Sequence, residues 1–212
     1  MSKEKKNIAD HPFFVWMGFV GDVAALSVLW LVCCIPLVTI GASTTAAFSV
    51  AGKMAAKDDY LIIRDFLVAL KRDWKQATLL WGILAVAAVL IVTDYQIGLA
   101  NPGSLGGALI AVSAALGVCL ISMVGASFSL LGRFSYPGVR TVLADAVRLC
   151  LANPATMLLW LGLVLWLPVS YYFIPAVFFY LRLPWLFLGG GTCITAFSFA
   201  IRPFFRKLEK KR

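Results

Sequence analysis

Long apolar stretches without charged residues constrain this chain more than any other feature of its sequence. Residues 13–52 contain one charge, at Asp22, and four later stretches contain none: 77–93, 105–132, 149–181 and 183–201. A helix needs about 20 mostly apolar residues to cross a bilayer. Only 14% of the 212 residues are charged, against roughly 25% in soluble domains. These features exclude a soluble enzyme, a disordered protein and a secreted disulfide scaffold, and they indicate a polytopic membrane protein.

The apolar stretches predict an all-α fold, a polytopic transmembrane helical bundle in which residues 1–212 form a single membrane domain. The first stretch is long enough for two spans, divided near Pro36–Gly41 because proline disfavours helix in the residue before it. The second span is short and rich in Ser, Thr and Ala, so a partial or re-entrant span is an alternative there. The six predicted spans are residues 13–34, 42–56, 76–97, 105–131, 154–174 and 184–202.

The basic residues predict the orientation of these spans, because Lys and Arg concentrate in the cytoplasmic segments of membrane proteins. Six spans with both termini in the cytoplasm place 18 of the 19 Lys and Arg residues inside and leave only Arg182 outside. Five spans with the N-terminus outside would place 15 inside and 4 outside. The charge distribution therefore favours six spans. The basic residues lie between apolar stretches, where they suit anionic lipid headgroups rather than nucleic acid.

Two cytoplasmic segments of this topology have the pattern of amphipathic helices. In residues 58–74, apolar side chains recur every four positions from Ile62 to Trp74. Residues 139–152 repeat the pattern and end at Asn153-Pro154. Such helices either dock a protein partner or lie flat at the lipid interface and support the bundle. The candidate docking residues are Arg64, Phe66, Leu70, Lys71, Arg72, Trp74, Arg140 and Arg148.

The two amphipathic segments also align with each other at an offset of 76 residues, which superposes Tyr60 on Tyr136. A parallel internal repeat of residues 42–98 and 105–174 would explain the alignment, because each unit then contains a span, a cytoplasmic helix and a returning span. Chance similarity between apolar segments is the alternative.

Asp22 is the one charged residue in the first apolar stretch. A carboxylate near the centre of a bilayer costs about 2.5 kcal/mol or more unless it is protonated, paired or hydrated, so such a residue indicates a functional site. Its predicted partners are hydroxyl groups of the second span. In the alternative, the first span begins at Gly21 and Asp22 lies at the cytoplasmic interface. The candidate intramembrane polar site consists of Asp22, Thr39, Ser43, Thr44 and Thr45.

Small residues and cysteines are interpreted as packing features. Small side chains at every fourth position from Ser43 to Ala55 allow close helix packing and would permit a homodimer. Gly189–Gly191 provide either a close contact or a hinge. The five cysteines and the single histidine, His11, show no metal-ligand or catalytic spacing. We therefore expect no metal, no cofactor and no enzymatic activity.

Four strings in the chain share the pattern of one family: GDVAALSVLWLVCCI (21–35), PLVTIGASTTAAF (36–48), FLVALKRDWKQATLLW (66–81) and LANPAT (151–156). They resemble the YesL family of small bacterial membrane proteins, most strongly in residues 13–85. The resemblance implies an integral protein of the bacterial plasma membrane. Members tend to be encoded beside carbohydrate ABC importers and glycan-degrading enzymes, which implies an accessory role in sugar uptake. The resemblance implies no catalytic residue, and only the segment Thr39–Thr44 corresponds to a signature of the family.

The sequence supports two hypotheses of function. The first is a non-enzymatic accessory or regulatory partner of a carbohydrate ABC importer, docking through the cytoplasmic amphipathic helices. The alternative is a small autonomous solute or ion transporter that uses Asp22 and the second span. A sugar site needs many polar groups, and apolar spans with one or two polar positions offer few, so the accessory role is favoured. The expected partners are the lipid bilayer, ABC transporter subunits and a second copy of the chain.

Overall fold

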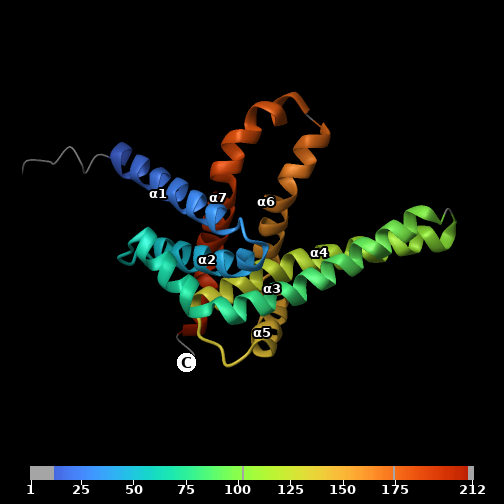
Figure 1. Ribbon diagram of the computed structural model, residues 1–212, viewed down its shortest axis with the longest axis horizontal. Coiled ribbons are helices and arrows are strands. Elements are labelled where there is room, and N and C mark those ends of the chain that lie inside the picture. Colours follow the sequence, from blue (N-terminus) through green and yellow to red (C-terminus); the bar gives the residue numbers. More distant parts are fainter. Residues whose placement is uncertain (1–11, 102, 174, 210–212) are drawn as a thin grey trace, which may run out of the picture.

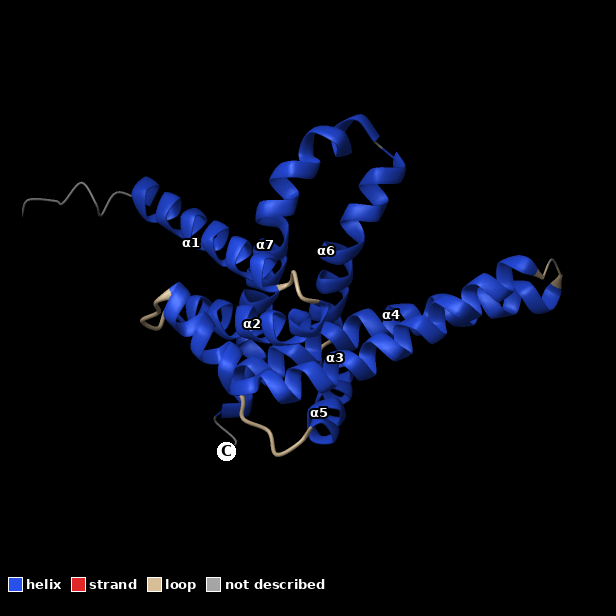
Figure 2. Ribbon diagram, in the orientation of Figure 1, coloured by secondary structure: helices blue, strands red, loops and turns tan. Residues whose placement is uncertain are grey.

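The computed structural model describes the backbone of residues 12–101, 103–173 and 175–209 and the side chains of residues 17–101, 103–166 and 189–206. His11 and the side chain of Arg182 lie outside these ranges. All regular structure in the described residues is helical (Figures 1 and 2), which confirms the predicted all-α class. The helices are α1 (Pro12–Cys33), the single-turn η2 (Leu37–Thr39), α2 (Ile40–Ala56), α3 (Ile62–Ala100), α4 (Ser104–Arg133), α5 (Val139–Ala152), α6 (Pro154–Phe173) and α7 (Pro175–Glu209).

A tight turn separates α1 from α2, as Pro36 predicted. The Thr39 hydroxyl lies within hydrogen-bonding distance of the carbonyls of Cys33 (2.7 Å) and Pro36 (2.8 Å). α2 ends where Lys57 adopts a left-handed conformation with φ of 59° and its N–H bonds back to the helix. Both helices match their predicted spans within two residues.

The third helix differs from its prediction. The sequence predicted a separate amphipathic helix in residues 58–74 and a span at 76–97, but α3 runs without interruption from Ile62 to Ala100. Its 39 residues span about 58 Å at roughly 1.5 Å per residue, almost twice the bilayer hydrocarbon core. Residues 71–77 contain no glycine or proline, so the change from amphipathic to apolar pattern gives the helix no reason to end.

The later helices follow the predictions more closely. α4 and α6 match the predicted spans within two residues, and α5 has the predicted bounds. A bend of 100° separates α5 from α6 at Asn153. α7 is longer than predicted, because it begins at Pro175 rather than at residue 184 and continues through Gly189–Gly191. Three consecutive glycines therefore do not break the helix.

α2 occupies the centre of the bundle (Figure 1), where it packs against α1, α3, α4 and α7. Eleven of its 17 residues are buried, including most of the small residues between Ser43 and Ala55. These small residues therefore serve packing within the chain. Figure 1 shows α3 and α4 leaving this centre as one pair and α6 and α7 as a second pair.

Length and composition identify fewer spans than the six predicted. Among the described residues, α3 and α4 are long and apolar enough to cross a bilayer, and the bent pair α5–α6 is a third candidate if it forms one broken span. Met17–Cys33 form a shorter apolar helix, and the buried α2 presents little surface to lipid. Only 17% and 11% of the most apolar stretches of α3 and α4 are buried, which indicates a bilayer around this pair. Two to three candidate spans are thus identified, and the count of six remains a prediction.

The two halves of the predicted repeat differ at one point. The first half combines its amphipathic segment and returning span in α3, whereas the second divides them between α5 and α6. Trp81 lies against Gly41 at the start of α2, and Trp160 lies against Gly125 of α4. Gly41 precedes the first predicted unit and does not align with Gly125, so these contacts do not test the repeat, which remains a prediction.

Candidate functional site

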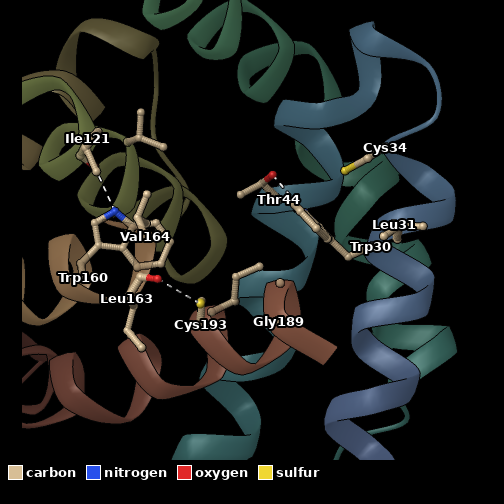
Figure 3. Close-up of a pocket in the computed structure, with 13 residues that line it drawn as sticks. Trp30, Leu31, Cys34, Thr44, Ile121, Trp160, Leu163, Val164, Gly189 and Cys193 are labelled. Carbon is tan, nitrogen blue, oxygen red and sulfur yellow. Dashed lines mark hydrogen bonds between the residues drawn. The ribbon is translucent and has the colours of Figure 1, made fainter. Parts of the chain in front are cut away.

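A cavity of about 620 Å³ lies between α1, α2, α4, α6 and α7 (Figure 3). Figure 3 shows Trp30 of α1 and Trp160 of α6 on opposite sides of it. Sites for small molecules commonly have volumes of roughly 300–1,000 Å³, so the cavity has the size of a ligand site. Among its described lining residues none is acidic or basic. These residues are Trp30, Leu31, Cys34, Thr44, Ile121, Val124, Trp160, Leu163, Val164, Gly189, Gly190, Cys193 and Ile194.

Glycines shape the walls of this cavity. Gly189 and Gly190 line it with the backbone of α7. A Cβ atom added at Gly190 would come within 2.5 Å of the Trp30 ring, and one added at Gly125 would come within 2.6 Å of the Trp160 indole nitrogen. Each tryptophan therefore packs directly on the backbone of a neighbouring helix. The structure shows a close contact at Gly190, which agrees with one of the two alternatives, a contact or a hinge, that the sequence offers.

The polar groups of the walls are already hydrogen-bonded within the protein. Trp30 Nε1 donates to Thr44 Oγ1 at 3.2 Å, and Trp160 Nε1 donates to a backbone carbonyl of α4 at 3.0 Å. Cys34 Sγ and Ser43 Oγ share a hydrogen bond of 3.0 Å. The described walls thus offer apolar contact and few free groups for a polar ligand.

The predicted intramembrane polar site does not assemble in this form. Asp22 accepts a hydrogen bond of 2.6 Å from Tyr60, which follows α2, rather than from a hydroxyl of α2. Hydroxyls on helices commonly bond to carbonyls three or four residues earlier, and those of α2 do so. Nearby backbone carbonyls accept from Thr39, Ser43, Thr44 and Thr45.

Tyr60 places Asp22 at the level of the loop between α2 and α3. This loop also carries Lys57, Asp58 and Asp59, so the contact agrees with the alternative in which Asp22 lies at the cytoplasmic interface. Burial and the hydrogen bond to Asp22 raise the pKa of Tyr60 to about 12, so the phenol remains a hydrogen-bond donor to a higher pH than an ordinary tyrosine. Asp22 and Tyr60 are 38 residues apart, and no local sequence pattern signals their contact.

Charged residues surround the C-terminal end of α2. Lys53 Nζ lies 3.1 Å from Asp65 of α3, and Arg202 of α7 donates to the carbonyl of Ala56 at 3.1 Å. The last carbonyls of a helix carry partial negative charge, so a guanidinium stabilises this end. The contacts tie α2 to α3 and α7.

The predicted docking residues divide into buried and exposed groups. Phe66 is fully buried, with 0% of its surface exposed, and Leu70 is half-buried against the core. Phe66 is therefore a core residue rather than a docking residue, because this side of α3 packs on the bundle. The exposed candidates are Arg64, Lys71, Arg72, Trp74, Arg140 and Arg148.

Another part of the amphipathic pattern remains exposed. Ile63 (63%), Leu67 (42%) and Trp74 (53%) are exposed apolar side chains, and their spacing places them along one side of a helix. Arg64 and Lys71 are exposed beside them. We refer to these five residues as the α3 face. It combines a narrow apolar stripe with two basic side chains.

A hydrogen bond joins α3 to the segment that leads into α5. Gln76 Nε2 of α3 donates to the carbonyl of Tyr136, just before α5, at 3.0 Å. α5 buries Val142, Ala146 and Leu149 and exposes Arg140 and Arg148. The segment that leads into α5 therefore lies close to the C-terminal end of the α3 face.

Comparison with known proteins gives one match. The profile of a family of bacterial membrane proteins, described as a protein of unknown function, DUF624, matches residues 23–95. No curated protein and no solved structure matches the chain. The matched residues include the hydroxyl-bearing start of α2 and the α3 face, whereas α4, α6 and α7, which form much of the cavity, lie outside the match.

Proposed function

We propose that this protein is a non-enzymatic accessory or regulatory partner of a carbohydrate ABC importer in the bacterial plasma membrane. In this proposal the chain has six spans and both termini in the cytoplasm. The observation that carries the proposal is the exposed α3 face, next to which the buried Phe66 anchors the same helix to the bundle.

The composition of the α3 face supports docking of a protein. Tryptophan and arginine are the residue types that contribute most to protein–protein interfaces. Trp74 and Arg64 are both exposed, and Lys75 Nζ lies 5.8 Å from the centroid of the Trp74 ring. The basic side of α5 follows a segment that lies close to this surface. The choice of a carbohydrate importer rests on the YesL resemblance.

A pull-down with matched charge reversals tests the proposal. The tagged full-length chain is purified in mild detergent from its native membrane, and retained proteins are identified by mass spectrometry. We expect an ABC permease or ATPase to be retained. Arg64→Glu and Lys71→Glu should each reduce its recovery about tenfold, equivalent to roughly 1.4 kcal/mol. Arg206→Glu, at an exposed basic position of α7, is the matched control and should retain the partner.

Two results would contradict docking through the α3 face. One is equal recovery of the ABC component with all three variants, and the other is recovery of the chain without any ABC component. Recovery of the chain without any ABC component would favour the alternative function, a small solute or ion transporter. Reconstituted vesicles would then be assayed for flux, and Asp22→Asn should abolish it while Ser104→Ala, at the exposed start of α4, should not.

A further inference from the structure

The cavity between Trp30 and Trp160 is distinct from the α3 face and has no role in the proposed docking. Five helices contribute to it, and its volume is about 620 Å³. Its described walls are aliphatic, aromatic and thiol side chains, bare backbone at Gly189 and Gly190, and Thr44, whose hydroxyl is hydrogen-bonded within the protein.

Polar occupants do not fit these walls. A buried water molecule needs two to four polar partners, but the indole N–H groups of Trp30 and Trp160 are already donated within the protein. A sugar would bury many hydroxyl groups without partners at a high free-energy cost. An anionic group held between these walls would find no basic side chain among the described lining residues.

The cavity is partly open to the surface of the bundle, so material from the surroundings reaches its walls. Apolar walls are covered most favourably by apolar material. The occupant is therefore apolar where it contacts the walls. The bilayer that surrounds α3 and α4 is the available source of such material.

The end of the cavity at Cys34 indicates where the polar headgroup of a bound lipid would remain. Cys34 lines the cavity and directly follows α1, at the turn that leads into α2. A turn between two adjacent predicted spans lies near the membrane surface. A chain that enters beside Cys34 would keep its headgroup at this surface and its hydrocarbon between the tryptophans.

We propose that this cavity is a binding site for one acyl chain of a membrane phospholipid. Trp30 and Trp160 form its two aromatic walls, and Gly189 and Gly190 make room for the chain along α7. The bound lipid fills the space between α1, α2, α4, α6 and α7 and is an integral part of the folded protein.

Native mass spectrometry of the full-length chain tests the site. The protein is reconstituted in phosphatidylglycerol vesicles with palmitoyl and oleoyl chains, re-extracted in mild detergent and measured beside two variants. Val164→Trp adds an indole inside the cavity, whereas Val89→Trp makes the same change on the exposed side of α3. We expect one phospholipid on wild type and Val89→Trp, and about tenfold less on Val164→Trp, equivalent to roughly 1.4 kcal/mol.

Three outcomes would overturn the proposal: no retained lipid on wild type, equal retention on both variants, or retention of a free fatty acid or detergent in place of phospholipid. If Val164→Trp does not fold, fluorescence provides the second measurement. Trp160 is 7% exposed, so bulk lipid does not reach it. In vesicles of phosphatidylcholine with brominated chains, the fluorescence that Trp160→Phe removes should be quenched in wild type, relative to vesicles with unbrominated chains. An unquenched Trp160 would contradict the site.

Discussion

Ser27 and Gly191 join α1 to α7 through one hydrogen bond across 164 residues of sequence. The backbone N–H of Gly191 donates to Ser27 Oγ at 3.1 Å, and the same hydroxyl donates to the Val23 carbonyl at 2.8 Å. The two helices approach so closely that a Cβ atom at position 191 would overlap the Ser27 hydroxyl. This contact fixes the crossing of α1 and α7 beside the cavity.

Gly191→Ala should therefore destabilise the protein. The added methyl group must displace Ser27 or the Val23 carbonyl, and overpacking of this kind costs about 1–3 kcal/mol. Thermal unfolding in detergent measures the effect. Gly162→Ala is the control, because a Cβ atom there meets nothing within 4 Å, and it should leave the midpoint unchanged or raise it. Equal behaviour of the two variants would contradict the close contact.

Phe66→Ala and Trp74→Ala should separate packing from docking on the same helix. Truncation of a fully buried phenylalanine costs about 3–5 kcal/mol, so Phe66→Ala should lower the unfolding midpoint strongly. Trp74 is 53% exposed, and surface substitutions usually change stability by less than about 0.5 kcal/mol. Trp74→Ala should keep the fold and weaken recovery of the partner. A large loss of stability in Trp74→Ala would show that Trp74 packs against the protein.

Tyr60 should ionise at a higher pH than an ordinary tyrosine. Burial, followed by the hydrogen bond to Asp22, raises its pKa from 10.0 to about 12. Folding thus favours the protonated phenol, so its contribution to stability is complete below pH 10 and is lost as the pH rises toward about 12. The tyrosinate absorbance of wild type minus that of Tyr60→Phe reports this titration. In Asp22→Asn the midpoint should fall but stay above 10, because burial persists; an unchanged midpoint would mean that Asp22 does not contact Tyr60.

The topology predicts which loops share a membrane side. Asp58 and Ser135 precede α3 and α5, and the Gln76–Tyr136 hydrogen bond joins α3 to the segment before α5. Ser104 begins α4, directly after the turn that ends α3. In a background with the five cysteines replaced, Asp58→Cys and Ser135→Cys should react with an impermeant maleimide only in inside-out vesicles. Ser104→Cys should react only in intact cells. Labelling of Asp58→Cys and Ser135→Cys from opposite sides would contradict the orientation.

The bounds of most helices could be predicted from the sequence because apolar length and proline position are local signals. Pro36 and the Asn153-Pro154 pair marked real breaks. The sequence divides α3 wrongly, because the amphipathic pattern changes at Trp74 although the backbone has no cause to stop there. Whether a helix continues depends on the residue types where the two patterns meet, here residues 71–77. Hydropathy indicates only whether water, lipid or protein surrounds the helix.

The site was less accessible to sequence reasoning. Asp22 was recognised as unusual, but its partner Tyr60 is 38 residues away and belongs to a loop. Gly189–Gly191 were recognised as a close contact or hinge, yet the cavity beside them depends on side chains from five helices. A cavity of this kind arises from the packing of helices that are distant in the sequence. Its lining residues therefore show no regular spacing along the chain.

The central position of α2 has a consequence for biogenesis. α2 leaves the ribosome early, but two of its contacts come from α7: Phe197 packs edge-on against Phe48 with ring centroids 5.9 Å apart, and Arg202 bonds to the carbonyl of Ala56. Until α7 is synthesised, the face of α2 that it covers has no partner within the chain. The growing chain must therefore be shielded by the insertion machinery or by neighbouring helices, and the bundle closes only after translation has passed residue 202.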